Sequence, residues 1–177
     1  NAHPKQIKRL FRRCFLIGRR FRLAHVKFGE KVIEVSTFRR DPDPSEQVQE
    51  VSGDLLRHRD NTFGTPEQDA RRRDFTVNGL FYNIRGFSVI DHVGGLKDLD
   101  EKVIRCIGDP EIRYREDPVR MIRAVRFASR LGFRIEETTL AAIKKHHTEI
   151  AKASSSRMYE EIIRLFGYGS GASAFRM

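Results

Sequence analysis

The clearest structural signal in the chain is the stretch Asp117-Pro118-Val119-Arg120-Met121-Ile122-Arg123-Ala124-Val125-Arg126-Phe127. Its arginines, counted on to Arg130, recur at intervals of three, three and four residues, which places them on one face of a helix. Gly132 follows as a residue suited to end a helix in the left-handed region. The stretch therefore predicts a helix from Asp117 to Leu131 that carries one cationic stripe. The apolar residues expected on its packed side are Val119, Ile122, Val125 and Phe127.

Downstream of this helix the pattern stays helical. Residues 138–151 and 156–166 both have apolar residues at helical spacing, and strand patterns stop at Glu111. The sequence therefore predicts an all-helical part over residues 109–177.

Upstream, the pattern mixes helices and strands. Residues 4–13 predict a short helix, and the strand-like runs 22–28 and 31–38 are separated only by the hairpin-sized turn Gly29-Glu30. Further strands are expected over residues 87–93 and 103–107, and a long loop over 39–66. The predicted fold class is α+β, with a mixed domain over residues 1–108 and a helical domain over 109–177.

Positive charge is concentrated at the start of the chain. The formal net charge is +10, and residues 1–40 hold twelve basic and two acidic side chains. Arginines outnumber lysines by 25 to 9, and the planar guanidinium group suits phosphate oxygens. The excess of positive charge and of arginine favours a nucleic acid or a nucleotide as the ligand. A basic surface that only keeps the protein soluble would have the same composition.

Composition excludes several classes of protein. Hydrophobic residues make up 39% and charged residues 33% of the 177 residues, which excludes collagen-like chains and argues against wholesale disorder. No apolar run approaches the length of about 20 residues that a membrane span needs. Cys14 and Cys106 are too few for a disulfide framework, so we expect two reduced thiols and a cytoplasmic protein.

A first polar cluster follows the central loop, in the run Arg71-Arg72-Arg73-Asp74-Phe75-Thr76-Val77-Asn78. Three adjacent arginines before a helix start would converge on phosphate. Asp74 resembles a helix N-cap, and the spacing of four places Asp74 and Asn78 on one face of the helix that would follow. Asn78 could bind a ribose hydroxyl, and Asp74 could cap the helix, position an arginine or approach a metal. A plain capped helix explains the same residues.

A second cluster lies at the start of the strong helix. Asp117 and Arg120 are one turn apart, and a carboxylate with a guanidinium complements the amino group and ring nitrogen of adenine. Cytosine offers a matching donor and acceptor, so the pair leaves both bases open. An ordinary acid–arginine pair within a helix is the structural alternative.

Two weaker signals complete the set. The run Asp91-His92-Val93-Gly94-Gly95 predicts a tight turn from a strand into a helix, more typical of chain reversal than of phosphate binding. Glu34 is a lone carboxylate in an apolar strand, where exposure to solvent is the ordinary interpretation and metal binding the alternative.

Three blocks of the sequence are Arg72–Asn78, Asp91–Gly95 and Glu116–Arg120. Their order and their spacing resemble the class II nucleotidyltransferases, the family of bacterial poly(A) polymerases and tRNA CCA-adding enzymes. The run Leu16–Val26, with its Arg-Arg-Phe-Arg pattern, favours the poly(A) polymerase branch. The resemblance covers nearly the whole chain. It implies a nucleotidyltransferase head, a mixed sheet with flanking helices whose N-terminal part is missing here, followed by a helical neck truncated at its C-terminus.

The resemblance also implies roles for individual residues. Asp74 matches an active-site acid, and Glu34 matches the strand position of a further carboxylate and possible metal ligand. The residues expected to bind the nucleotide are Arg73 and Asn78 at the sugar and phosphates, Asp117 and Arg120 at the base, and Arg123 and Arg126 at the phosphates. The basic pattern Arg19, Arg20 and Arg22 is expected to bind RNA.

One departure from the family pattern concerns the metal. The family holds two Mg²⁺ ions with an Asp-x-Asp pair that should precede Asn1, and this pair is absent from the sequence. Glu34 and Asp74 cannot hold two ions alone. The expectation is that this chain by itself cannot add nucleotides.

The predicted function of the parent protein is template-independent addition of AMP from ATP to RNA 3′ ends, with release of pyrophosphate. The expected partners are RNA 3′ ends and ATP, in a monomer that contacts no membrane. The alternatives are CCA addition, which would use CTP as well as ATP, and a non-catalytic RNA-binding module.

Overall fold

The computed structural model describes residues 2–18, 22–41, 62–167 and 171–176. The chain divides into two compact units, residues 1–72 and residues 73–177. Mixed helices and strands precede a helical C-terminal part, as the sequence predicts. Across the described residues, no helix is both long enough and apolar enough to cross a membrane.

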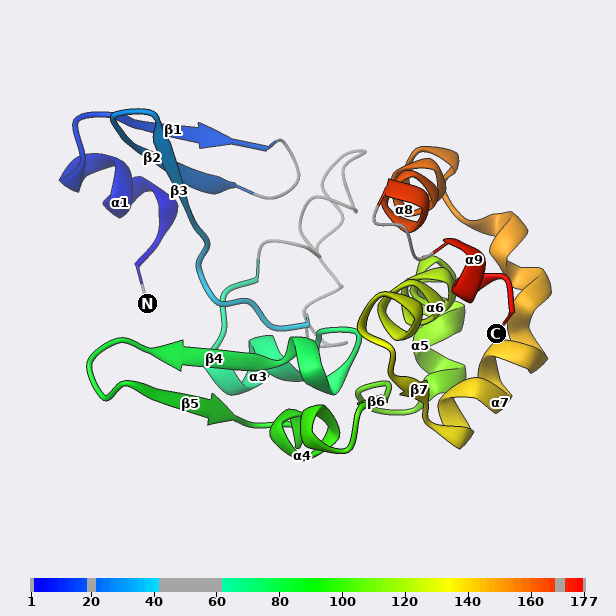
Figure 1. The fold of residues 1–177 in the computed structure, drawn as a ribbon. Coiled ribbons are helices and arrows are strands. Elements are labelled where there is room, and N and C mark those ends of the chain that lie inside the picture. Colours follow the sequence, from blue (N-terminus) through cyan, green and yellow to red (C-terminus); the bar gives the residue numbers. More distant parts are fainter. Residues whose placement is uncertain (1, 19–21, 42–61, 168–170, 177) are drawn as a thin grey trace, which may run out of the picture. The chain divides into compact units, whose positions relative to one another are not determined.

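The first unit holds a three-stranded antiparallel sheet in the order β1-β2-β3, formed by Cys14–Ile17, Leu23–Phe28 and Lys31–Val35 (Figure 1). Helix α1, Pro4–Leu10, packs against β1 and β2. Gly29 makes the β2–β3 turn at a φ of +58°, a conformation that favours glycine. The core of this unit consists of the buried side chains of Ile7, Cys14, Ala24 and Val26.

Two sequence predictions for the first unit need correction at their ends, and most of the predicted loop lies outside the described residues. The predicted helix 4–13 ends at Leu10, because the chain turns there into β1, which the sequence did not indicate. The predicted loop 39–66 lies outside the described residues over 42–61. Helix α3, Pro66–Arg71, begins at the last residue of this predicted loop. Thr65 is its N-cap, and Gln68 completes a capping box.

The second unit begins with a ribbon of two strands. Strands β4, Leu80–Asn83, and β5, Ser88–Asp91, pair antiparallel, and helix α4, Gly95–Asp100, follows them (Figure 1). The predicted helix after Asp74 is wrong: a 3₁₀ turn over Thr76–Asn78 leads directly into β4. Backbone pairing explains the difference, because Thr76 N–H donates to the Arg105 carbonyl and Ile107 N–H donates to the Asp74 carbonyl.

The helical part contains α5, Pro110–Glu116, α6, Val119–Leu131, α7, Glu137–His146, α8, Ser155–Gly167, and α9, Gly171–Ala174. Helix α6 packs against α8 and α9, and α5 packs against α7. Gly132 ends α6 at a φ of +67°, as predicted.

Strand pairing continues beyond Glu111, contrary to the prediction, because β7, Arg134–Ile135, pairs in parallel with β6, Val103–Ile104. Ile104 of β6 forms a core cluster with Phe75 and with Ala124 and Ala128 of α6, all of them fully buried. The predicted packed side of α6 is shifted, since Val119, Met121, Ala124 and Ala128 are its buried apolar residues.

Candidate nucleotide site

Asp74 lies at the centre of a hydrogen-bonded cluster in the second unit. Its Oδ1 accepts from the backbone N–H of Phe75 and from Asn78 Nδ2, both at 2.9 Å. Its Oδ2 accepts from Arg123 Nε at 2.7 Å. The sequence therefore pairs Asp74 with Asn78 correctly, although a 3₁₀ turn rather than an α-helix brings them together. These donors occupy most of the acceptor positions of the carboxylate.

Arg73 lies beside this cluster and contacts it through Asn78. Its Nη1 donates to the Asn78 carbonyl at 2.9 Å, and its guanidinium group lies 5.0 Å from the centre of the Phe81 ring. Arg113 Nη2 donates to the Arg73 carbonyl at 3.0 Å. The structure thus brings Arg73, Asp74, Asn78 and Arg123 together in one place.

Glu161, on α8, binds two arginines of α6, Arg123 and Arg126. Its side chain is buried, with Oε1 accepting from Arg123 Nη1 at 2.9 Å and Oε2 accepting from Arg126 Nε at 2.6 Å. Burial acts to lower the pKa of the Arg123 guanidinium, but Asp74 and Glu161 outweigh burial and raise this pKa. Arg123 therefore stays charged between two carboxylates.

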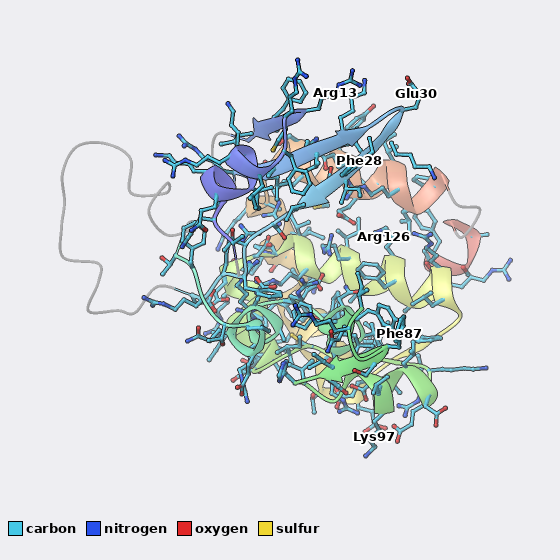
Figure 2. The ribbon with its side chains drawn as sticks, turned by 90° about the vertical axis from the view of Figure 1, so that its left-hand side faces the viewer. Arg13, Phe28, Glu30, Phe87, Lys97 and Arg126 are labelled. Carbon is cyan, nitrogen blue, oxygen red and sulfur yellow. The ribbon has the colours of Figure 1, made fainter. Side chains whose placement is uncertain are left out.

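The predicted cationic stripe on α6 is not uniform. Arg126, labelled on α6 in Figure 2, is only 4% exposed and packs 4.2 Å from the centre of the Phe127 ring. Arg130 lies exposed at the other end of the helix. The arginines of this helix therefore differ in exposure, with Arg126 buried and Arg130 exposed. The phosphate-binding role of Arg126 stays a prediction.

Asp117 and Arg120 do not form the acid–arginine pair within a helix that was the structural alternative, and Asp117 lies before the helix rather than in it. Asp117 ends α5 in an extended conformation, and α6 begins only at Val119. The carboxylate of Asp117 instead binds the guanidinium group of Arg157 from α8 at 2.9 and 2.6 Å. Arg120 Nη1 donates to the Arg113 carbonyl at 3.1 Å and to Glu116 at 3.3 Å.

Asp91 fills the turn that the two glycines form. Its carboxylate accepts hydrogen bonds from four consecutive backbone N–H groups, those of residues 93–96, at 2.9–3.0 Å. Burial acts to raise the pKa of Asp91, but the N–H groups of Leu96, Val93, Gly95 and Gly94 outweigh it and lower the pKa. The turn therefore holds a carboxylate of the chain itself, which agrees with the prediction of a structural role.

Glu34 lies in the first unit, on β3, directly opposite His25 of β2. Its Oε1 is 3.2 Å from His25 Nε2, and its side chain is 64% exposed. Arg22 is exposed just before β2, while Arg19 and Arg20 lie outside the described residues. The roles of these four residues stay predictions.

The residues that the structure describes do not fit a two-metal centre. Among the described residues, no group of three or more histidine, cysteine, aspartate or glutamate side chains could hold a metal ion. Asp74 is occupied by protein donors, and Glu34 contacts a histidine. Cys106 offers no thiolate, because burial raises its pKa to about 11.

Sequence reasoning missed two residues that organise the site, Arg157 and Glu161. They are four residues apart on α8, so they lie on one face of that helix. This spacing was readable in the sequence. The contacts themselves were not, because the partners lie 35 to 40 residues earlier in the chain.

Comparison with known proteins gives the family. A family model described as "Poly A polymerase head domain" matches residues 1–105, more than half of the chain. The chain belongs to this family. A second model, described as "Probable RNA and SrmB- binding site of polymerase A", matches residues 132–177.

Individual relatives of the family agree with this membership. Poly(A) polymerase I of Salmonella typhi is 50% identical in an alignment that covers 99% of this chain and 38% of that protein. The CCA-adding enzyme of Bacillus subtilis is 38% identical in an alignment that covers 93% of this chain and 40% of that protein. The chain thus spans about two fifths of the length of these relatives.

A solved structure shows the same fold. The CCA-adding enzyme of Bacillus stearothermophilus, in complex with CTP, superposes with a TM-score of 0.81 at 32% identity, over 98% of this chain and 40% of that one. The predicted nucleotidyltransferase head, followed by a helical part, is therefore confirmed.

Proposed function

We propose that the whole protein carrying this chain adds AMP from ATP to RNA 3′ ends without a template, as in the polyadenylation of mRNA. In this reaction the 3′-hydroxyl oxygen forms a bond to the α-phosphorus of ATP. The bond from that phosphorus to the bridging oxygen breaks, and pyrophosphate leaves. The observation that carries the proposal is the 50% identity with Poly(A) polymerase I over nearly the whole chain, against 38% with a CCA-adding enzyme.

The proposed roles follow the geometry of the second unit. Arg73 and Asn78, which share the cluster around Asp74, bind the sugar and phosphates of ATP. Arg123, held in place by Asp74 and Glu161, provides a fixed positive charge for the phosphates, with Arg126 behind it. Such preorganised charge stabilises a transferring phosphoryl group without reorganisation during the reaction.

Base recognition is assigned to Asp117 and Arg120. The ionised carboxylate accepts from the exocyclic amino group of adenine, and the guanidinium group donates to the ring nitrogen. Both lie at the junction of α5 and α6, where Asp117 retains 21% of its side-chain exposure and Arg120 16%. They are therefore reachable by a base and already restrained by neighbouring side chains.

The divalent metal that the family resemblance implies would supply charge at the phosphates and activate the 3′ hydroxyl. Because the described residues do not fit such a centre, no step of the proposal passes through it. Asp74 and Glu34 are the carboxylates proposed to act in catalysis, and Mg²⁺ is the proposed ion.

The remaining proposals concern organisation. We assign residues 1–108 to the head domain and 109–177 to the neck, with RNA bound by Arg19, Arg20 and Arg22. The protein is proposed to be a cytoplasmic monomer. Cys14 and Cys106 are both free and buried, which suits a reducing compartment.

The test uses the whole protein, Mg²⁺ and labelled RNA primers, some ending in CC and some not, with each nucleoside triphosphate supplied alone. The expected result is a long tail from ATP on either primer and little extension from CTP. A single A added only after CC, with CTP used on shorter ends, would establish CCA addition instead. RNA binding with no extension from any nucleotide would identify a non-catalytic RNA-binding module.

A further inference from the structure

Asp117 occupies a position that no helix fixes. Helix α5 ends at Glu116 and α6 begins at Val119, so Asp117 lies in the two-residue connection with an extended backbone. From residues close to it in the sequence, the Asp117 side chain accepts one hydrogen bond, which Val119 N–H donates to Oδ1 at 3.3 Å. A carboxylate held this weakly could rotate about its side-chain bonds.

Arg157 supplies the missing restraint. Its Nη1 donates to Oδ1 of Asp117 at 2.9 Å, and its Nη2 donates to Oδ2 at 2.6 Å, a two-point contact made across 40 residues of sequence. Parallel hydrogen bonds of this kind fix the plane of a carboxylate as well as its position. Arg157 itself is anchored in the first turn of α8, which packs against α6.

The contacts leave Asp117 with one free acceptor position. A carboxylate offers about four lone-pair positions. Among the described residues, Oδ1 receives Val119 N–H and one arm of Arg157, and Oδ2 receives only the other arm. The remaining lone pair on Oδ2 therefore has a direction set by Arg157.

We propose that Arg157 is a positioning residue for nucleotide choice, because it aims the free lone pair of Asp117 at the base. The inference rests on the proposed function, in which Asp117 reads the base. An ionised carboxylate can only accept, so it binds the amino group of adenine or cytosine and repels the carbonyl oxygen that guanine or uracil places there. Arg157 keeps this acceptor oriented and limited to one partner.

A purely structural role makes a different prediction. The side chain of Arg157 is 53% exposed, and exposed ion pairs contribute little to stability. If Arg157 only linked α8 to the α5–α6 junction, its removal would change thermal stability slightly and leave nucleotide choice intact. Nucleotide choice therefore separates the two roles.

The experiment compares Arg157→Ala and Arg157→Lys in the whole protein with a matched control, Lys145→Ala. Lys145 forms a similarly exposed, long-range pair, with its Nζ donating to the two carboxylate oxygens of Glu111 at 2.7 and 2.9 Å. For each variant, kcat and KM are measured with ATP and with GTP in primer extension, and the melting temperature is recorded.

The expected result for Arg157→Ala is an about tenfold fall in the preference for ATP over GTP, mainly through KM, at nearly unchanged melting temperature. Arg157→Lys keeps the charge but loses the two-point contact, so its preference should lie between those of Arg157→Ala and the unaltered protein. Lys145→Ala should keep the full preference. In an Asp117→Ala background, removing Arg157 should change the preference no further.

Full ATP preference in Arg157→Ala, equal to that of Lys145→Ala, would overturn the inference while leaving the proposed function intact. A further loss of preference on removing Arg157 in the Asp117→Ala background would also overturn it, because Arg157 would then act without Asp117. If the unaltered protein fails to extend RNA with ATP, the proposed function falls, and this inference falls with it.

Discussion

Glu161 shows how much of this site depends on a single buried side chain. It is 4% exposed and receives hydrogen bonds from three arginines, Arg123, Arg126 and Arg164. Arg123 also pairs with Asp74, and Arg164 also pairs with Glu160. The Glu161 carboxylate therefore links α8 to α6 and, through Arg123, to Asp74. Removing the negative charge would leave buried arginine charge unbalanced.

We therefore expect Glu161→Gln to destabilise the whole protein by about 3 kcal/mol, the range typical of a broken buried ion pair. The measurement is the free energy of unfolding from urea titration. Glu160→Gln is the matched control, since the side chain of Glu160 is 63% exposed and pairs with Arg164 at 3.3 Å. The control should change stability by less than about 0.5 kcal/mol. Equal, small effects in both variants would show that the Glu161 cluster does not hold the helices together.

At the scale of elements, the turn between β5 and α4 depends on Asp91. Its carboxylate satisfies four backbone N–H groups that would otherwise lack partners at the start of α4. Asp91→Asn should reduce the free energy of unfolding by about 1 kcal/mol at neutral pH, because the amide oxygen can replace only part of this set. Asp100→Asn, an exposed residue at the other end of α4, is the control.

The pH dependence of this effect has a definite sign. The pKa of Asp91 is lower in the folded protein than in an unfolded chain, so ionisation stabilises the fold fully above about pH 4. That contribution is lost as the pH falls through the lowered folded pKa. The difference in stability between Asp91→Asn and the unaltered protein should therefore shrink below about pH 4. A difference that stays constant from pH 7 to pH 3 would contradict this account.

How far the sequence predicts an element depends on how local its cause is. The β2–β3 turn at Gly29 and the end of α6 at Gly132 were predictable, because each requires a backbone conformation that glycine adopts readily. Helix α3 has a complete local start signal, the capping box of Thr65 and Gln68. The helix was not predicted because it follows directly on the long polar stretch that was interpreted as a loop. Strands β6 and β7 have two residues each, so only their pairing, 31 residues apart, defines them.

The same distinction applies to the candidate site. Asp74 and Asn78 were paired correctly from a spacing of four, although the helix assumed between them does not exist. Asp117 and Arg120 were expected one turn apart on one helix, but Asp117 precedes α6, and its carboxylate binds Arg157 of α8. Tertiary contacts between α6 and α8 decide which charges meet, and residue spacing within one helix carries no information about them.

At the scale of the whole molecule, the basic first 40 residues predict salt-sensitive RNA binding. Each phosphate contact with single-stranded RNA should add about 0.7 to the slope of log affinity against log salt concentration. Changing Arg19, Arg20 and Arg22 together to glutamine should therefore reduce that slope by about 2. The affinity is measured by fluorescence anisotropy of the whole protein at several salt concentrations.

A control variant with the same change in charge separates contact from overall charge. Lys97, Arg115 and Lys152 are exposed, and each lies beside a glutamate of its own segment. Changing these three to glutamine should leave the slope nearly unaltered. If both triple variants reduce the slope equally, RNA responds to net charge, and the assignment of Arg19, Arg20 and Arg22 as RNA contacts is wrong.

The most direct test of the central claim is the nucleotide preference of Asp117→Ala in the whole protein. The measurement is kcat/KM for ATP, GTP and CTP in primer extension, together with the affinity for the RNA primer. Because Asp117 is proposed to contact the base and not the RNA, we predict that the preference for ATP collapses while RNA affinity changes by less than about twofold. An unchanged preference for ATP over GTP and CTP would contradict the assignment of Asp117 as the residue that reads the base.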